Sequence, residues 1–126
     1  MAAGKGTRMK SSKPKVLHRL GGRALAQHVI DTAARISARS VVVITGHGAD
    51  QVEAGLSAPL VESGAALKLQ FVRQEPQLGT GHAVLQTLTF LEADLPTVVL
   101  YGDVPLIGAA TLTRLIEVAG HGLGVL

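Results

Sequence analysis

The sequence opens on a stretch whose residue types are typical of phosphate binding. Gly4-Lys5-Gly6-Thr7-Arg8 combines glycines, which let backbone N–H groups turn toward an anion, with cationic side chains that neutralise one. It lacks the Gly-Lys-Ser/Thr ending of a Walker loop and the third glycine of the dinucleotide fingerprint. The stretch therefore predicts a phosphate-binding loop outside these two classes, with a solvated, flexible tail as the alternative.

A further cation that could act on phosphates is Lys15, which follows Pro14. Because proline stiffens the backbone, a lysine beside it can be a positioned charge. An ordinary surface lysine is the alternative.

Residues 74–83 read Gln-Glu-Pro-Gln-Leu-Gly-Thr-Gly-His-Ala. A strand end, a glycine turn and a helix start would together form a pocket lined by backbone, with a helix N-terminus directed at the ligand. Gln74 offers the paired donor and acceptor that the edge of a pyrimidine base requires. The alternative is a tight connection in which Thr80 caps the helix.

Asp103 is the carboxylate best placed to hold a metal ion, because it follows the apolar run 98–101. A carboxylate at the end of a buried strand is a usual anchor for Mg²⁺, which prefers hard oxygen ligands. The alternative is a turn aspartate satisfied by local backbone amides. The five histidines (18, 28, 47, 82 and 121) show no ligand spacing, so they are interpreted as loop and cap residues, and no zinc site is predicted.

Composition excludes several classes of protein. With 47% hydrophobic and 17% charged residues the chain is not intrinsically disordered, and it has no cysteine for disulfides, thiolate metal sites or cysteine catalysis. No apolar run approaches the roughly 18 residues of a membrane span. The amino terminus has no signal-peptide pattern, so a cytoplasmic location is expected.

The net charge of +3 is unevenly distributed, because six of the twelve basic residues lie in the first nineteen positions, where there is no acid. Such a basic segment indicates an anionic partner. The three aromatic residues are too few for the base-stacking surfaces of single-strand nucleic-acid binders. Glycines lie between the basic residues instead, which favours a small phosphorylated ligand.

Apolar periodicity predicts the elements that would position these residues. Helices are expected over 25–36, 50–57, 82–91 and 112–119, and strands over 41–44, 67–71 and 98–101, the first and last of these fully buried. Strands that alternate with helices predict an α/β fold, a Rossmann-like, doubly wound and mostly parallel sheet. Ligands of such sheets bind at the carboxyl ends of the strands, where the motifs above would meet.

Both ends of the sequence are expected to lie inside elements. Met1-Ala2-Ala3 stands where a central first strand would lead into the glycine-rich loop, and residues 122–126 look like the start of another strand. We therefore expect a sheet that is incomplete at both ends, with residues 1–126 forming the nucleotide-binding part of a larger domain. Strands without their partners leave backbone groups unpaired, so the 126 residues alone are expected to be poorly stable and inactive.

Taken together, the motifs resemble the sugar-phosphate nucleotidyltransferases. The opening, with Pro-Lys-Val-Leu after it, is similar to that family's Leu-Ala-Ala-Gly-x-Gly-Thr-Arg-Met, with Met1 in place of the leucine. Residues 27–31, 78–83 and 101–106 are similar to its bacterial bifunctional branch, which couples a uridyltransferase to an acetyltransferase. The resemblance runs along the whole chain in order.

The resemblance implies the fold of nucleotide-diphospho-sugar transferases and a specific reaction. UTP and N-acetylglucosamine 1-phosphate would give UDP-N-acetylglucosamine, a peptidoglycan precursor, and pyrophosphate, with Mg²⁺ as cofactor and neither nucleic acid nor membrane as partner. The branch also acetylates glucosamine 1-phosphate and forms homotrimers through a left-handed β-helix domain. That domain and the second metal ligand are expected to lie beyond Leu126.

The resemblance also implies residue roles. Arg8 and Lys15 would neutralise phosphates as the catalytic cations, and Asp103 would hold Mg²⁺. The implied nucleotide-binding residues are Ala2, Ala3, Gly4, Gly6, Thr7, Lys15, Gln74, Gly79 and Thr80, of which Gln74 and Gly79 would contact the uracil. The implied sugar-phosphate-binding residues are Tyr101, Gly102 and Asp103.

Three alternatives remain open. A relative that uses another nucleoside triphosphate or another sugar phosphate would carry the same motifs, and binding of UTP against CTP would distinguish it. A non-catalytic nucleotide-binding module would be expected to lack Arg8, Lys15 or Asp103, and all three are present. A nucleic-acid binder would show a steep dependence of binding on salt.

Overall fold

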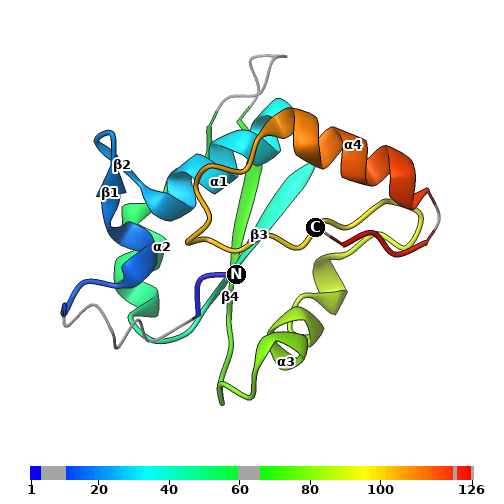
Figure 1. Ribbon diagram of the computed structural model, residues 1–126. Coiled ribbons are helices and arrows are strands. Elements are labelled where there is room, and N and C mark those ends of the chain that lie inside the picture. Colours follow the sequence, from blue (N-terminus) through cyan, green and yellow to red (C-terminus); the bar gives the residue numbers. More distant parts are fainter. Residues whose placement is uncertain (4–10, 60–65, 121, 126) are drawn as a thin grey trace.

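The computed structural model of the chain describes residues 1–3, 11–59, 66–120 and 122–125 (Figure 1). Four of the predicted site residues, Gly4, Gly6, Thr7 and Arg8, lie outside these ranges. No helix within the ranges is both long enough and apolar enough to cross a lipid bilayer.

The described residues form helices and short strands in alternation. The α-helices are α1 (Leu25–Arg35), α2 (Ala49–Gly55), α3 (Thr80–Leu85) and α4 (Ala109–Ala119), and the 3-10 turns are η2 (Lys15–Leu17) and η3 (Leu88–Phe90). The strands are β1 (Arg19–Leu20), β2 (Arg23–Ala24), β3 (Ser40–Thr45) and β4 (Lys68–Arg73). The helices predicted over 25–36, 50–57 and 112–119 and the strands predicted over 41–44 and 67–71 are confirmed.

β3 and β4 form a parallel pair that runs from Ser40 opposite Lys68 to Thr45 opposite Arg73. The β-branched residues of β3 favour extended backbone, and α2 lies in the connection between the two strands. Parallel strands joined through a helix are the unit from which an α/β sheet is built. The prediction of an α/β fold with a parallel sheet is confirmed.

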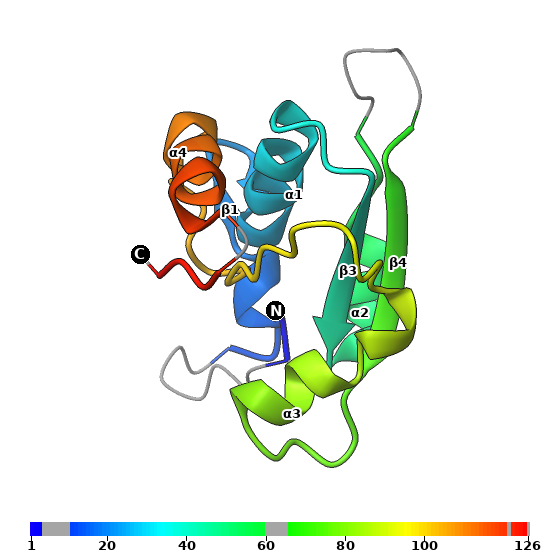
Figure 2. The ribbon, with the colours of Figure 1, turned by 90° about the vertical axis from the view of Figure 1, so that its right-hand side faces the viewer.

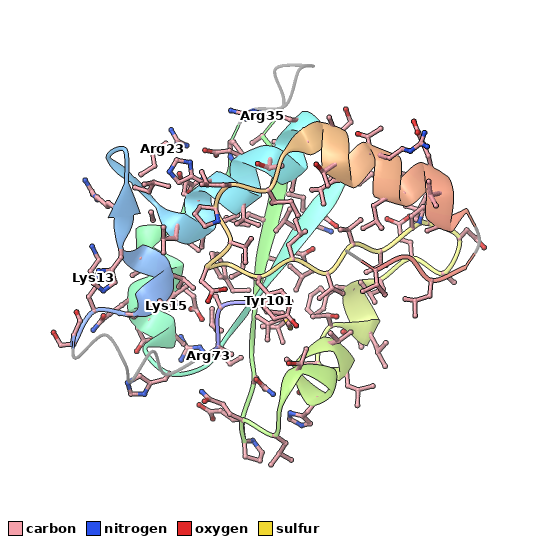
Figure 3. The ribbon with its side chains drawn as sticks, in the orientation of Figure 1. Lys13, Lys15, Arg23, Arg35, Arg73 and Tyr101 are labelled. Carbon is pink, nitrogen blue, oxygen red and sulfur yellow. The ribbon has the colours of Figure 1, made fainter. Side chains whose placement is uncertain are left out.

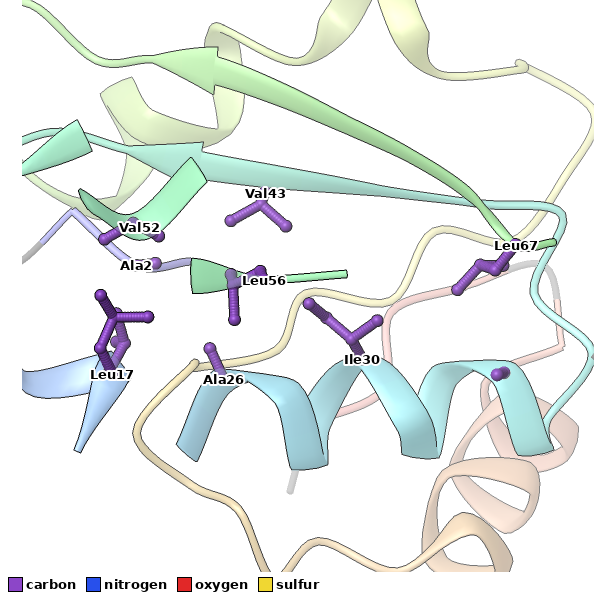
Figure 4. Packing of buried hydrophobic residues seen from close by; sticks show 10 residues of the cluster. Ala2, Leu17, Ala26, Ile30, Val43, Val52, Leu56 and Leu67 are labelled. Atoms are coloured by element: carbon purple, nitrogen blue, oxygen red, sulfur yellow. The ribbon is translucent and has the colours of Figure 1, made fainter. Parts of the chain in front are cut away.

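The hydrophobic core lies between α1 and this strand pair. Figure 2 shows α1 and α4 on one side of β3 and β4. Ala26 and Ile30, one helical turn apart on α1, belong to the same buried cluster as Val43 of β3 (Figure 4). The predicted apolar face of α1 is therefore the face that is buried.

A hairpin that the sequence analysis did not predict leads the chain into α1. β1 and β2 are antiparallel, with Leu20 opposite Arg23. The two residues between them, Gly21 and Gly22, have φ of 58° and 84°. Two successive positive φ angles are the requirement of a tight type I′ hairpin turn, which glycine meets without strain.

The helix predicted over 82–91 is wrong beyond Leu85, where α3 ends. The buried Thr87 donates its hydroxyl proton to the Val84 carbonyl oxygen at 2.7 Å. Such a local side-chain bond competes with regular helix, and the chain continues as the short turn η3. Leu88, an apolar residue within the predicted helix, is 57% exposed.

The strand predicted over 98–101 is also wrong, because these residues form no ladder with β3. Val99 and Tyr101 are about half exposed. The Met1 ammonium donates to the Leu100 carbonyl oxygen at 2.6 Å, and the Ala2 N–H donates to the Ile44 carbonyl oxygen at 2.8 Å. The amino-terminal residues therefore lie between the end of β3 and residues 100–102, in the central position that the sequence analysis gave them.

Beside Met1, the space between β3 and residues 96–100 is a cavity of about 430 Å³. Apolar side chains from both segments line it, including Val41, Val43 and Val98. The prediction that β3 is buried on both faces holds only for its end, since residues 40–42 are half-buried. Residues 122–125 form no strand either, and Leu123 and Val125 are exposed.

Candidate functional site

The carboxyl ends of β3 and β4 bring together loops that are distant in the sequence. The Gln74 N–H donates to the Thr45 carbonyl oxygen at 2.8 Å, which continues the ladder past the strand ends. A Cβ atom on Gly46 would collide with the side chain of Gln77 and lie 3.1 Å from the Ala3 Cβ atom. The loops after β3 and β4 and the amino-terminal residues therefore touch at this edge, as the topology predicts.

A lysine and an aspartate meet near the amino terminus. The Lys15 ammonium donates to a carboxylate oxygen of Asp103 at 2.6 Å, across 88 positions of sequence. Both side chains are partly exposed, at 42% and 34%. The hydrogen bond from Lys15 is the largest cause that lowers the pKa of the Asp103 carboxyl below its usual range. The two residues to which the resemblance assigns phosphate and metal binding are thus adjacent.

The position of Lys15 (Figure 3) is fixed by the turn that carries it. Pro14 precedes η2, and its carbonyl oxygen accepts the Leu17 N–H at 2.9 Å. Pro14 also packs against Gly48, where a Cβ atom would lie 2.8 Å from the proline Cγ. Gly48 has a φ of 71°, which favours glycine as well. The buried proline therefore holds the backbone of Lys15 in place, as the positioned-charge interpretation of the sequence requires.

Replacing Lys15 with methionine is expected to raise the pKa of Asp103, because the variant keeps an aliphatic stem and loses the hydrogen-bonding cation. A carboxyl group whose pKa is lowered in the folded state stabilises the fold at pH values above its ordinary pKa, and this stabilisation is lost as the pH falls through the folded-state pKa. The free energy of unfolding of Lys15→Met should therefore fall less steeply with acid than that of the unsubstituted chain. Carbon-13 NMR titration of the Asp103 carboxyl measures the shift. The matched control is Lys13→Met, at an exposed lysine two residues away, and an unchanged Asp103 pKa in Lys15→Met would contradict the assignment.

The residue before Asp103 is bonded to the amino terminus. The Gly102 N–H donates to the Met1 carbonyl oxygen at 2.9 Å. A Cβ atom on Gly102 would lie 3.1 Å from that oxygen and 3.2 Å from Val16, so the close approach favours glycine. Burial lowers the pKa of the Met1 ammonium, and the Asp103 carboxylate opposes this shift. Tyr101 is 52% exposed beside them.

The Gln74 side chain lies in the loop after β4 and is almost fully buried, at 3% exposed. Its amide nitrogen donates to the Gly79 carbonyl oxygen at 2.9 Å and lies 3.1 Å from His82 Nδ1. One amide hydrogen is therefore bonded to Gly79, and the other faces His82 Nδ1. In this arrangement Oε1 is the atom of the predicted donor and acceptor pair that is left for a base.

Gly79, and not Thr80, stands at the N-cap of α3, with a φ of 99° that favours glycine. Thr80 is the first residue of α3, and no side-chain hydrogen bond caps the helix. The alternative in which Thr80 serves as the cap is therefore wrong.

Within the described residues, no three His, Cys, Asp or Glu side chains gather around one point. Mg²⁺ in nucleotide sites is usually bound through one or two carboxylates together with substrate phosphates and water. Asp103 fits that role, because its lowered pKa keeps it ionised and part of its side chain is exposed. The residues present are therefore compatible with a metal ion that arrives with a nucleotide.

Comparison with models of protein families assigns this chain to a family. The family model described as the MobA-like NTP transferase domain matches residues 1–125. The chain belongs to the MobA-like NTP transferase domain family.

Relatives of this NTP transferase domain include two named "Bifunctional protein GlmU". The one from Albidiferax ferrireducens is 67% identical over 120 residues, which are 95% of this chain and 26% of the relative. The one from Acidovorax ebreus is 60% identical and covers 100% of this chain and 26% of the relative. The chain thus spans about a quarter of the length of these relatives.

A solved structure is also similar to this NTP transferase domain. It is a UDP-glucose pyrophosphorylase complexed with UDP-glucose, with a TM-score of 0.63 and 19% identity. The match covers 92% of this chain and 51% of that one. This likeness shows a nucleotidyltransferase-like fold, as predicted.

In this NTP transferase domain, the described residues predicted for the site lie in two groups. One contains Lys15 and Asp103 with Tyr101 and Gly102, and the other contains Gln74 with Gly79 and Thr80. Ala2 and Ala3 lie between them, with Ala2 bonded to the end of β3 and Ala3 against Gly46.

Two further residues of this edge, Gly46 and His82, were not among the predicted site residues. Gly46 lies two residues after the strand predicted over 41–44 and directly after β3, and a glycine at a strand end was a signal for close backbone approach. His82 was interpreted as a loop or cap residue. Its position just after the glycine turn that follows Gln74 was the signal that could have found it.

Proposed function

We propose that this chain is the nucleotide-binding part of an enzyme that transfers a uridylyl group from UTP to N-acetylglucosamine 1-phosphate. The observation that carries the proposal is the Lys15–Asp103 pair, joined at 2.6 Å next to the backbone groups of Met1 and Gly102. A cation and an ionised carboxylate side by side are what a magnesium-bound triphosphate requires. The choice of uridine and of the sugar rests on the resemblance in the motifs around residues 27–31, 78–83 and 101–106.

The reaction needs positioning and charge neutralisation more than covalent help from the protein. A phosphate oxygen of the sugar phosphate forms a bond to the α-phosphorus of UTP. The bond from that phosphorus to the bridging oxygen breaks, and pyrophosphate leaves. Mg²⁺, when bound by Asp103, supplies charge neutralisation at the phosphates.

Different residues of the chain would position the substrates and neutralise their charge. Lys15, released from Asp103, would neutralise phosphate charge, and Arg8 is proposed for the same task. Tyr101 and Gly102 would border the sugar phosphate. The nucleotide would be bound through backbone at Ala2, Ala3, Gly4, Gly6 and Thr7, with Thr80 next to the base.

Acetyl transfer and trimer formation are proposed for a separate β-helix domain of a longer protein, and we assign neither to residues 1–126. A cytoplasmic location follows from the same proposal, since the substrates are soluble cytoplasmic metabolites.

The test uses a chimera in which this chain replaces the aligned segment of the Albidiferax ferrireducens relative. Lys15→Ala is expected to lower uridylyl transfer about ten- to a hundredfold, the worth of one charge-assisted phosphate contact. It should leave the preference for UTP over CTP unchanged. Gln74→Ala should show the opposite pattern, with a relaxed preference. Release of pyrophosphate with each nucleotide is the measurement.

Lys13→Ala is the matched control and should behave as the unchanged chimera. A chimera that releases pyrophosphate with neither nucleotide would refute the proposed activity. A Lys15→Ala variant whose base preference shifts would move Lys15 from the triphosphate to the base.

A further inference from the structure

His82 has no role in the mechanism above, yet its ring lies between two glutamine side chains. The half-buried ring places Nδ1 at 3.1 Å from Gln74 Nε2 and Nε2 at 3.2 Å from Gln86 Nε2. His82 lies on α3, in the third position of a helix that begins directly after Gly79. The histidine therefore contacts the side chain proposed to bind the base.

The hydrogen-bond roles of these groups follow from Gly79. Its carbonyl oxygen can only accept, so the atom of Gln74 at 2.9 Å from it must be the amide nitrogen. That nitrogen has a second hydrogen, which is directed to His82 Nδ1. Nδ1 must then be an acceptor, which leaves the proton of the neutral ring on Nε2. A proton on His82 Nε2 then requires the Gln86 amide to turn its oxygen toward the ring, which gives up the longer bond of 3.4 Å from Gln86 Nε2 to the His82 carbonyl oxygen.

The consequence is that Oε1 is the atom of the Gln74 side chain that is left to bond to a ligand. Both of its amide hydrogens are held, its backbone N–H is bonded to Thr45, and its side chain is 3% exposed. Among the residues that the structure describes, none donates to Oε1. A fixed acceptor matches the N3–H of uracil, whereas N3 of cytosine is itself an acceptor and would be repelled.

We propose that His82 is a positioning residue that fixes the Gln74 amide as an acceptor and thereby sets the preference for a base with a ring N–H. This inference rests on the proposed function, because it assumes that Gln74 faces the base. Gly79 and His82 act on the two hydrogens of one amide, so the loss of His82 removes one of two constraints.

The first test determines which ring nitrogen of His82 carries the proton. Long-range ¹H–¹⁵N NMR of the 126-residue chain should show an unprotonated Nδ1 and a protonated Nε2. A proton on Nδ1 would overturn the proposal, since the ring would then donate to Gln74. This measurement needs no nucleotide and no activity.

The second test measures the ratio of kcat/KM for UTP to that for CTP in the chimera described above. His82→Ala should reduce the ratio about two- to tenfold, the worth of one neutral hydrogen bond. His82→Asn, whose side-chain oxygen can accept in place of Nδ1, should restore it. Leu85→Ala, at a residue of α3 that is 59% exposed, is the control and should leave the ratio unchanged.

The outcomes separate this inference from the proposed function. If Gln74→Ala relaxes the ratio and His82→Ala does not, the role of His82 is refuted and the function stands. If neither changes the ratio, Gln74 does not contact the base, and the roles proposed for Gln74 and His82 are both refuted. If the unsubstituted chimera has no activity, the proposed function fails, and a proton on Nε2 would support only the orientation of Gln74.

Discussion

Asp103→Asn is expected to slow uridylyl transfer by about a hundredfold or more, which is the scale of losing a group that stabilises charge in a transition state. Asparagine keeps the shape of the side chain and removes its charge. Two interactions then weaken, the proposed bond to Mg²⁺ and the 2.6 Å ion pair with Lys15. Because the pair is partly exposed, its contribution to stability is small, and the fold should survive.

The measurement is the rate of pyrophosphate release by the chimera at a series of Mg²⁺ concentrations, together with its thermal unfolding. Asp94→Asn, at an exposed aspartate in the loop after η3, is the matched control. Full turnover of Asp103→Asn at limiting Mg²⁺ would refute the metal assignment. A large fall in the unfolding temperature would instead give Asp103 a structural role.

The parts of the fold that the sequence predicted are those decided by local pattern. The β-branched run of β3 and the apolar spacing on α1 each specify an element without reference to the rest of the chain. The rule that ligands bind at the carboxyl ends of parallel strands then predicted which loops meet. It could not predict that Lys15 and Asp103 touch, because that contact depends on how Pro14 packs against Gly48.

The failures have physical reasons of the same kind. Residues 98–101 have the composition of a buried strand, but a strand exists only through its neighbours, and here the neighbouring space is a cavity except at Met1 and Ala2. The predicted helix stops after Leu85, where the N–H groups of Gln86 and Thr87 bond to carbonyl oxygens three residues back and the Thr87 hydroxyl bonds to Val84. Apolar periodicity does not register these contacts. The orientation of the Gln74 amide follows from its contacts with Gly79 and His82, which no sequence motif encodes.

Filling the cavity between β3 and residues 96–100 should give the largest increase in stability. An apolar extension of about five residues, alternating valine and threonine, added ahead of Met1 would run between β3 and residues 96–100. Its backbone would pair with both segments, and burial of the alternate valine side chains would stabilise the fold by about 1.5–3 kcal/mol each. Ordering costs about 1–2 kcal/mol per residue, which roughly cancels the contribution of the valines. The net gain then comes from the new backbone hydrogen bonds, at about 0.5–1.5 kcal/mol each, and we expect it to be about 3 kcal/mol, with a rise of about 10 °C in Tm.

The titration of the Met1 ammonium gives a second test of the same extension. Burial lowers the pKa of its ammonium below the ordinary value of 8.0, so between the two pKa values the unfolded chain binds more protons than the folded chain. The stability of the 126-residue chain should therefore rise as the pH increases toward 8.0. In the extended chain the ammonium becomes an amide N–H, which can still donate to the Leu100 carbonyl oxygen, and this pH dependence should disappear.

Calorimetric unfolding of the chain with and without the extension, at several pH values, makes both comparisons. A glycine-serine extension of equal length is the matched control: it removes the charge from Met1 but has no side chains that would fill the cavity. It should abolish the pH dependence and raise Tm by less than the apolar extension does. Equal Tm values for the two extensions would show that the space between β3 and residues 96–100 does not accept a strand, because the only benefit would then come from removing a buried charge.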